Sequence, residues 1–466
     1  MTGPAAPRPP GSMGLPLIGE TPAFLANLFR FLEVRQRRYG NVFKSSALGR
    51  KIVFLAGIEG AEAFYDPGNI SRADAHPFPL VNMFGGINME MYDGPRHLAL
   101  KSMALSAFDH AAIAEYLPGI QRLVESTLAR LSAGGEFSAV AELRRLAIEA
   151  ICANVMGLEP GADTAAITRD YALVLTGILS VPIALPGTPY AKGRAARDRL
   201  LERIRAVIAE RRARPGSDGL SRMLTAVAAD GRTYTDPEAM LEVHHIVIAG
   251  FIVYALMAEA MRRLAERPEL RERCAGEVRA DAPAGPLTMG ALARLEHSSR
   301  VILEAKRTVP LVPLAFGRAK RTFSCGGFEV PEGWTVYLAL SLNNRDPAIY
   351  HEPDRFDPDR FAPPREEHRQ HPMAFIPQGA EPPTGHRCLG LDYSTILSLA
   401  FLALLLRGYE WELPPQDLAY NWKSVPPVPR DGLRVRLLPR ARDAFGGPGI
   451  KGSEVASTPN QEAPRA

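Results

Sequence analysis

The sequence contains little cysteine and little net charge, and each shortage excludes a class of protein. Its 466 residues include four cysteines, none in a CxxC pair, which argues against a zinc site and against a disulfide framework. The formal net charge is only +4, and no basic run is interleaved with aromatic residues. We therefore expect no nucleic-acid partner and a reducing compartment, the cytoplasm.

A long hydrophobic run is also missing. The two longest nearly uninterrupted apolar stretches, Ile246–Ala258 and Ile396–Leu406, fall short of the ~18–20 residues that a membrane-spanning helix needs. They are more typical of helices buried on all sides. Met1–Pro10 is rich in proline and alanine and lacks the apolar core of a signal peptide. These features predict a soluble protein without a membrane anchor.

What the chain does have is the composition of a large globular protein with many loops. Hydrophobic residues make up 46% and charged residues 23%, while 40 glycines and 41 prolines indicate frequent turns. Val42–Leu48 and Lys51–Ala56 alternate or run apolar, which predicts a hairpin. Helical periodicity is present in five longer segments, namely His110–Leu131, Glu142–Met156, Ala191–Arg214, Pro237–Glu266 and Met289–Thr308. The predicted fold class is mainly α with a small β subdomain.

The predicted organisation is one large domain between two tails. Residues 1–12 are expected to form a flexible N-terminal tail. Residues 441–466 are expected to be disordered, because they are rich in glycine, proline and serine. The domain between the tails has these predicted limits: 13–440 for the whole, about 58–308 and 389–407 for the helical part, and about 40–57 and 309–365, with C-terminal strands, for the β-rich part.

Cys388 carries the strongest chemical signal in the chain. It lies in Gly385–Gly390, directly ahead of an apolar run. Taken alone, such a cysteine is most often a buried free thiol. Four phrases precede it in order, namely Glu304–Arg307, Arg318, Gly327–Val336 and Asn344–Phe361. In this combination the chain resembles the cytochrome P-450 superfamily of heme-thiolate oxidases over about residues 9–440.

Two branches of that superfamily are similar to different segments of the chain. Pro9–Gly19, Tyr39–Phe43 and Pro426–Leu437 look most like the branch that hydroxylates retinoids and other isoprenoid lipids. Phe64–Phe108 is similar to the peroxide-using fatty-acid hydroxylases. The missing anchor is typical of a bacterial member of the superfamily.

The resemblance implies a cytochrome P-450 fold and a heme b cofactor with Cys388 as the ligand of the iron. A thiolate ligand favours O–O cleavage, and a helix that begins just after a cysteine lowers the pKa of its thiol. The superfamily places basic residues on the heme propionates, and the matches are His97, Lys101, Arg318 and His386. Each of these four residues alone could equally be a solvated surface charge.

A second set of residues is implied to brace the proximal side of the heme. Glu304 and Arg307 stand three residues apart on a predicted helix, a spacing that is ordinarily a surface ion pair. In the superfamily these two residues lock onto a downstream arginine, for which Arg360 is the match. We expect the three side chains to form a buried network that fixes the geometry of the heme pocket.

The central helix departs from the pattern of the superfamily. Ala249 and Gly250 are present, and Gly250 is predicted to relax the helix over the iron. The acid and the alcohol that normally follow are replaced by Ile252 and Val253, which can neither relay nor donate a proton. Glu242–Met261 also lacks the arginine that the peroxide-using branch carries on this helix. Oxygen activation with external electrons is therefore in question.

The heme loop departs from the pattern as well. The superfamily places a phenylalanine seven residues before the ligand, whereas Phe375, the candidate for this cofactor contact, stands thirteen residues before Cys388. Gly379–Thr384 is therefore predicted to be an insertion of about six residues. Comparable enlarged loops occur in the peroxide-using hydroxylases and in the heme-thiolate isomerases that rearrange fatty-acid hydroperoxides, and both work without a redox partner.

The distal pocket has one candidate acid–base group, Glu90. A carboxylate in an apolar pocket has a raised pKa and can shuttle a proton, although a solvated loop carboxylate is the alternative interpretation. His245 lies one helical turn before Ala249 on the same face and could otherwise be a hydrogen-bonded core histidine. The apolar candidates for a lipid pocket, each of which could equally be simple core, are Phe78, Leu80, Met83, Phe84, Phe251, Val253 and Val312.

The activity that these features favour is oxygen insertion into a C–H bond of a hydrophobic small molecule such as a lipid, fatty acid or isoprenoid. The oxidant is either hydrogen peroxide or dioxygen with a ferredoxin-type electron donor. Two alternatives stay open. One is a hydroperoxide isomerase or lyase of the heme-thiolate type, and the other is a non-catalytic heme-binding protein, which the loss of the acid–alcohol pair would allow.

Overall fold

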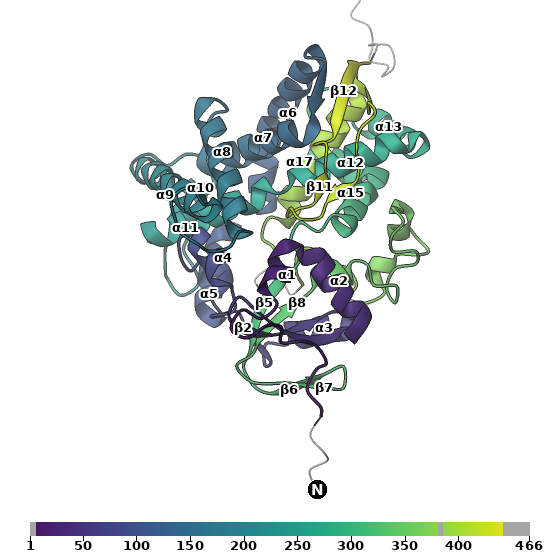
Figure 1. Cartoon of the computed structure of the whole chain (residues 1–466). Helices are drawn as coiled ribbons and strands as arrows, with labels where there is room; N and C mark the ends of the chain where they lie inside the picture. Colours follow the sequence, from purple (N-terminus) through teal and green to yellow (C-terminus); the bar gives the residue numbers. More distant parts are fainter. Residues whose placement is uncertain (1–5, 381–384, 441–466) are drawn as a thin grey trace, which may run out of the picture.

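The described residues, 6–380 and 385–440 of a computed structural model, form a helical body with a small β-rich part at one end (Figure 1). The α-helices are α1 (Thr21–Ala26), α2 (Leu28–Tyr39), α3 (Gly57–Tyr65), α4 (Phe78–Met83), α5 (Gly94–Leu105), α6 (His110–Ala133), α7 (Ala139–Ile151), α8 (Ala162–Ile178), α9 (Pro189–Ala213), α10 (Gly219–Thr225), α11 (Asp236–Phe251), α12 (Tyr254–Glu266), α13 (Pro268–Asp281), α14 (Met289–Arg294), α15 (Glu296–Thr308), α16 (Leu340–Asn343) and α17 (Leu391–Gly408). Shorter helical turns are η1 (Met89–Met91), η2 (Cys152–Met156), η3 (Pro358–Phe361) and η4 (Glu367–Arg369).

The β-rich part joins strands from residues 42–71 to strands from residues 315–338, and the C-terminal strands predicted for it form separate sheets. Its main sheet has the strand order β1-β2-β8-β5-β3, in which β2 and β8 are parallel and the other pairs antiparallel. A three-stranded sheet, β4-β12-β9, packs near α6 and α17. The strands are β1 (Val42–Ala47), β2 (Arg50–Leu55), β3 (Ile70–Ser71), β4 (Glu136–Ser138), β5 (Ala315–Ala319), β6 (Phe323–Cys325), β7 (Phe328–Val330), β8 (Thr335–Leu338), β9 (Tyr409–Glu412), β10 (Tyr420–Asn421), β11 (Val428–Pro429) and β12 (Arg434–Pro439).

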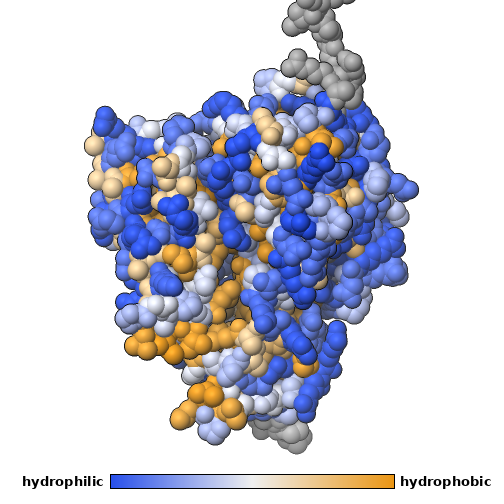
Figure 2. All heavy atoms as spheres, turned by 45° about the horizontal axis from the view of Figure 1, so that its top comes forward, coloured by the Kyte–Doolittle hydropathy of each residue, from blue (hydrophilic) through white to orange (hydrophobic). Residues whose placement is uncertain are grey.

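Two long apolar helical segments form the centre of the body. Asp236–Glu266, which contains α11 and α12, and α17 are long and apolar enough to cross a bilayer by length and composition, but 67% of the most apolar window of each is buried inside the molecule. α17 packs against α6, α12 and α15, so its apolar residues on all sides meet protein, as expected for a core helix. The outer surface is mainly hydrophilic, and its apolar side chains gather toward the lower part of the face in Figure 2.

α11 begins at a strong sequence signal and ends at a break. Thr235 and Glu238 form a capping box, in which each side chain accepts from the backbone N–H of the other residue. The helix then stops at Phe251 and resumes at Tyr254. At the break the hydrogen bonds tighten to an i to i−3 pattern, with Val253 N donating to Gly250 O over 3.3 Å. The predicted relaxation of the helix at Gly250 is therefore present.

The predicted fold class is confirmed, with differences in detail. The predicted hairpin is β1–β2, and the helix predicted over Pro237–Glu266 is two helices separated by this break. Sequence periodicity did not predict α8 and α13 as separate helices. The flexible tail expected over residues 1–12 is wrong for part of its described length, because Pro7 O accepts from Glu329 N and Pro10 O from Lys44 N. Residues 1–5 and the tail predicted over 441–466 lie outside the described residues.

Candidate active site

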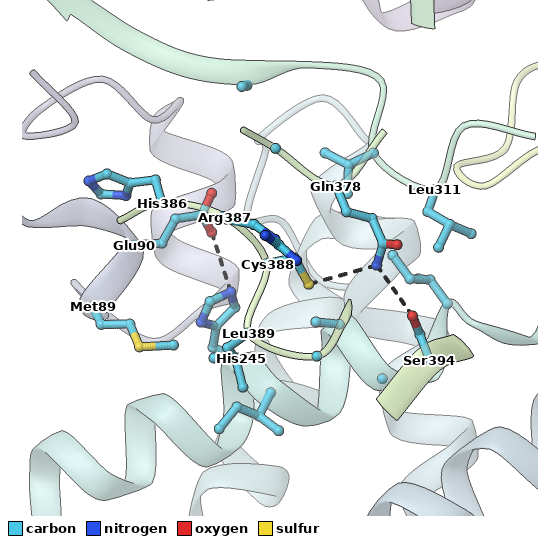
Figure 3. Close-up of a pocket in the computed structure, with 18 of the residues that line it drawn as sticks. Met89, Glu90, His245, Leu311, Gln378, His386, Arg387, Cys388, Leu389 and Ser394 are labelled. Carbon is cyan, nitrogen blue, oxygen red and sulfur yellow. Dashed lines mark hydrogen bonds and ion pairs between the residues drawn. The ribbon is translucent and has the colours of Figure 1, made fainter. Parts of the chain in front are cut away.

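A cavity of about 200 Å³ lies between the helical body and the β-rich part. Its floor is the loop around Cys388 that leads into α17, which we call the proximal side. Its roof is the end of α11 together with η1, which we call the distal side. Most of the remaining wall is apolar and includes Leu311 and Leu314 from the segment before β5. Figure 3 shows the sulfur of Cys388 pointing into this space from the loop.

Gln378 holds Cys388 through both its backbone and its side chain. Cys388 N donates to Gln378 O over 3.0 Å, and Gln378 Nε2 donates to the sulfur over 3.8 Å (Figure 3). Burial raises the pKa of the Cys388 thiol, and the N–H of Gly390 and the ammonium of Lys306 oppose this shift without cancelling it. The expected lowering of this pKa by the helix start is therefore outweighed in the protein alone. Coordination to a metal deprotonates such a thiol outright.

The described residues on either side of the predicted loop insertion are joined by a backbone contact. Cys388 N donates to Gln378 O, and these residues are ten apart in the sequence. Residues 381–384 of the predicted insertion lie outside the described residues. The prediction that Phe375 contacts the cofactor is wrong. Its ring packs instead on Phe361, with ring centroids 5.3 Å apart, because the longer loop places Pro377 and Gln378 at the cavity.

Basic side chains gather along one edge of the cavity. Lys101 Nζ donates to the carbonyl oxygens of Gly385 and Arg387. His97 contacts Met89 O through Nδ1 (2.7 Å) and Gly385 O through Nε2 (3.2 Å), and its ring stacks on His386 at 3.9 Å. All three predicted residues line the cavity. Burial and then the charge of Arg72 lower the pKa of His386 to about 2, so this imidazole is neutral rather than cationic.

The fourth predicted basic residue, Arg318, does not belong to this edge. Its side chain is exposed and donates to Gly333 O over 3.2 Å, outside the residues that line the cavity. The prediction is wrong because β5 turns this side chain outward. Arg72, which follows β3, lines the cavity instead. It is 7% exposed, donates to Phe316 O over 2.9 Å and lies 4.5 Å from the ring of Phe64.

The predicted bracing network is present beneath the cysteine loop. Arg307 makes two parallel hydrogen bonds to Glu304 of 2.7 and 2.8 Å, and Arg360 Nε donates to Glu304 Oε1 over 3.2 Å. All three residues are fully buried. Arg360 also donates to Glu367 Oε2 over 2.6 Å, so the network has a fourth charged member. Arg365 also donates to Glu367 Oε1 over 2.6 Å, so two carboxylates face three guanidinium groups, and every charge has a partner.

The distal side carries a charged cluster below an apolar stretch of helix. Glu90 Oε2 lies 3.3 Å from His245 Nε2 (Figure 3), and Glu90 Oε1 lies 3.6 Å from His76 Nε2. His245 Nδ1 is 3.8 Å from Glu242 Oε2, while Glu242 Oε1 accepts from Met89 N over 2.5 Å. Ala249, Gly250, Ile252 and Val253 line the cavity without offering a side-chain proton donor.

The pKa of Glu90 is shifted in the direction opposite to the one expected. Burial alone would raise the pKa of Glu90, but the contacts with His245 and His76 outweigh burial and hold it well below its usual value. Burial would lower the pKa of His245, but Glu242 and Glu90 outweigh it and raise this pKa to about 9. At neutral pH the cavity therefore faces an ionised carboxylate paired with an imidazolium.

Only some of the pocket candidates line the cavity. His245, Val253 and Val312 do so, whereas five predicted pocket residues are placed elsewhere. Phe78 is 65% exposed on the outer surface, and the ring of Phe251 points to Tyr171 and Tyr254. Met83 packs where α8 and α9 cross, Phe84 lies behind His245 with ring centroids 5.3 Å apart, and Leu80 packs partly buried on the core. These predictions are wrong because the helical turns that carry the five residues face the core or solvent.

Four contributing residues had little or no signal in the sequence. Glu242 stands three residues before His245, a helical spacing that could have paired them. Arg72 and His76 lie in a loop, so nothing in their spacing predicted the cavity. Gln378 reaches the sulfur only because of the longer loop.

Comparison with known proteins decides the family. The family model for cytochrome P450 matches residues 9–423. The chain is a cytochrome P450. Abscisic acid 8'-hydroxylase 3 of Oryza sativa subsp. japonica is 30% identical over 441 residues, which are 92% of this chain and 86% of that protein. The resemblance inferred from the motifs is thereby confirmed.

Two solved structures show the same fold. The structure of retinoic acid-bound cyanobacterial CYP120A1 has a TM-score of 0.86 and 26% sequence identity, covering 94% of this chain and all of that one. The structure of cytochrome P450EX alpha (CYP152N1) with myristic acid has a TM-score of 0.77 and 27% identity, again covering 94% of this chain and all of that one. This P450 is therefore an enzyme of the heme-thiolate oxidase type, and its cofactor is heme b.

The residues of the cavity fit this cofactor. Cys388 presents a sulfur at the floor of a mainly apolar cavity, and the basic edge offers Arg72, His97 and Lys101 to the two carboxylates of a porphyrin. A thiolate-ligated heme supplies oxygen activation when it is bound. The protein's own contribution would be to hold the sulfur in place, neutralise the propionates and exclude water from the apolar wall.

Proposed function

We propose that this P450 inserts an oxygen atom into a C–H bond of a hydrophobic small molecule, with Cys388 as the heme ligand and Arg72, His97, Lys101 and His386 around the propionates. The observation that carries this proposal is the Cys388 sulfur at the floor of an apolar cavity with cationic groups along one edge. Glu304, Arg307 and Arg360 would support the ligand loop from the proximal side without touching the substrate.

We further propose a fatty acid or an isoprenoid as the substrate class. The cavity wall is mainly aliphatic, with residues such as Leu311, Val312 and Ile252, so most of the ligand surface must be apolar. The two structural neighbours were solved with retinoic acid and myristic acid, each an apolar chain with one carboxyl end. An apolar chain can lie along the wall while a single polar end meets the Glu90–His245 cluster.

The oxidant that we favour is hydrogen peroxide, with dioxygen and a ferredoxin-type donor as the alternative. Ile252 and Val253 place no acid or alcohol beside Gly250, so the usual proton supply for dioxygen is missing from the central helix. A peroxide brings its own two protons and both electrons. We expect the protein to be soluble and to work in the cytoplasm.

Labelled oxygen tests this function. The heme-loaded protein is incubated with candidate fatty acids and retinoids, in parallel with labelled peroxide, labelled dioxygen plus a surrogate ferredoxin and reductase, and labelled water. We expect one labelled atom in a hydroxylated product from peroxide or from dioxygen. Label from neither oxidant in any product would overturn the proposal. Cys388→Ser serves as the control without a thiolate.

A second candidate function is the isomerisation or cleavage of a lipid hydroperoxide. The apolar Ile252–Val253 pair favours it, because that reaction needs no external proton relay. The same protein is given a fatty-acid hydroperoxide without any other oxidant. A rearranged product that keeps both of its original oxygen atoms would favour this function over C–H hydroxylation.

A further inference from the structure

The distal side of the cavity holds a charged pair in a wall that is otherwise apolar. Glu90 comes from η1 and His245 from α11, and their side chains point toward one another (Figure 3). The Glu90 side chain is 44% accessible, through the cavity that it lines, whereas the His245 side chain is 14% accessible. The carboxylate thus meets whatever enters the cavity, with the imidazole directly behind it.

Two groups around this pair hold it in place. Glu242 lies on the other side of the His245 ring and is anchored by the backbone N–H of Met89. His76 is the second neighbour, and its side chain is 2% accessible. The three contacts, at 3.3, 3.6 and 3.8 Å, are longer than a good hydrogen bond. Small side-chain movements can therefore strengthen one contact at the expense of another.

A purely structural role for the pair does not explain its position. The hydrogen bond from Met89 N to Glu242 already ties η1 to α11. Burying a charged pair is expensive compared with an apolar pair of the same size. A structural pair also has no need to face the cavity. The chain contains a matched example elsewhere, because His371 Nε2 and Glu62 Oε1 are also 3.3 Å apart but lie on the surface, with the glutamate side chain 55% accessible.

We propose that Glu90 and His245 act as one proton-transfer pair for small ligands in the distal cavity, in place of the acid–alcohol pair that Ile252 and Val253 replace. In the accepting direction, a bond between the ligand and its hydrogen breaks, the electron pair stays on the ligand, and an O–H bond forms on Glu90. His245 Nε2–H donates a hydrogen bond to the carboxylate before the transfer and to the carboxyl group after it, and keeps its own proton throughout. The reverse steps return the proton. This inference rests on the proposed heme-thiolate function and deepens it.

The experiment compares two small ligands of the ferric and ferrous heme in the full-length protein. Hydrogen cyanide must lose a proton when it binds, whereas carbon monoxide carries no proton. Stopped-flow absorbance gives the association rate constants of both ligands for wild type, Glu90→Gln, His245→Gln and the double variant. Glu62→Gln is the matched control, since it removes the same kind of contact at the surface.

We expect Glu90→Gln to slow cyanide association by about 100-fold, the range of a positioned acid–base group. His245→Gln should slow it by about 10-fold or more, which gives a second measurement if one variant folds poorly. Because the two groups act as a unit, the double variant should be no slower than Glu90→Gln. Carbon monoxide association should stay within about twofold in all variants, and Glu62→Gln should match wild type in both reactions.

Three results would overturn the proposal that Glu90 and His245 transfer protons as one pair. Cyanide rates within about twofold of wild type would show that no proton passes through it. Equal slowing of carbon monoxide would indicate a change of access instead, and multiplying effects of the two single variants would mean that the residues act separately. These results differ from a failure of the proposed function, which would appear earlier as a wild-type protein without the thiolate-type carbon monoxide spectrum.

Discussion

The two sides of the active site hold their charges in different ways. On the proximal side, Glu304, Arg307 and Arg360 are fully buried and joined by hydrogen bonds of 2.7 to 3.2 Å. On the distal side, Glu90 and His245 meet at 3.3 Å beside an open cavity. Short, complete contacts between buried charges fix a geometry, whereas longer contacts at a cavity let a group change its protonation state. We interpret the proximal side as a rigid support and the distal side as the adjustable one.

The largest effect on the proximal side is expected from removal of the Cys388 sulfur. Cys388→Ser should abolish the thiolate-type spectrum of the ferrous carbon monoxide complex entirely, because a hydroxyl cannot replace a thiolate as a strong donor to iron. Cys325→Ser is the control, since Cys325 is a buried cysteine of the β-rich part. An unaltered spectrum in Cys388→Ser would contradict the assignment of the ligand.

The next largest effect should come from breaking the proximal network. Arg360→Ala leaves Glu304 and Glu367 buried without their shared partner, which should lower the free energy of unfolding by about 3–5 kcal/mol. The exposed pair of Arg273 and Asp359, at 2.7 Å, offers the control, and Arg273→Ala should lower it by no more than about 1 kcal/mol. Urea unfolding of the two variants measures both values. Equal losses would show that burial of the network does not matter.

The proximal side could largely be predicted from the sequence, and the reason is physical. Glu304 and Arg307 share one helix, so their spacing already implies contact. Cys388 directly precedes a long helix, so local sequence also predicts its setting. These residues confirm that motifs carried by single elements transfer well from sequence to structure.

The distal side and the propionate edge could be predicted only in part. Glu90 and His245 were both candidates, but nothing local showed that η1 and α11 bring them together. Arg72 lines the cavity where Arg318 was expected. The face to which a strand residue points depends on the register of the strand, and a shift of one residue reverses it. The prediction for Phe375 failed for a related reason. A longer loop between Phe375 and Cys388 changes where the residues before it lie relative to the cavity.

The distal pair should also produce a pH dependence of stability. His245 has a pKa raised to about 9 by Glu242 and Glu90 against burial. A raised pKa in the folded protein gives stability that is complete below the ordinary pKa near 6.5 and is lost as the pH rises toward 9. Glu90, with a lowered pKa, stays ionised throughout this window. Wild type should therefore lose roughly 1–3 kcal/mol between pH 6.5 and 9 that His245→Gln does not lose.

Urea unfolding at several pH values checks this expectation. The other groups that face His245 are Glu242 from its own helix and, through Glu90, His76. Glu62→Gln, which alters the surface pair, should follow the wild-type curve. Parallel curves for wild type and His245→Gln would mean that the histidine is not charged in the folded protein.

The smallest expected effect concerns Lys306, the buried cation beneath the ligand loop. It is 2% exposed, its Nζ donates to Thr395 Oγ1 over 2.8 Å, and no ion pair is found for it among residues 6–380 and 385–440. Burial lowers its pKa to about 8, against the influence of Cys388, so it carries a positive charge at neutral pH. A positive charge near a thiolate stabilises the reduced, less positive iron relative to the oxidised state.

Lys306→Met should therefore make the reduction potential of the heme more negative by on the order of 60 mV, the equivalent of a tenfold change in a one-electron equilibrium. Spectroelectrochemical titration of the heme-loaded protein measures the shift. Thr395→Val is the matched control, because it removes the hydrogen bond but keeps the charge, and it should shift the potential much less. Equal shifts in the two variants would assign the effect to local packing, and the proximal side would then tune the heme through geometry alone.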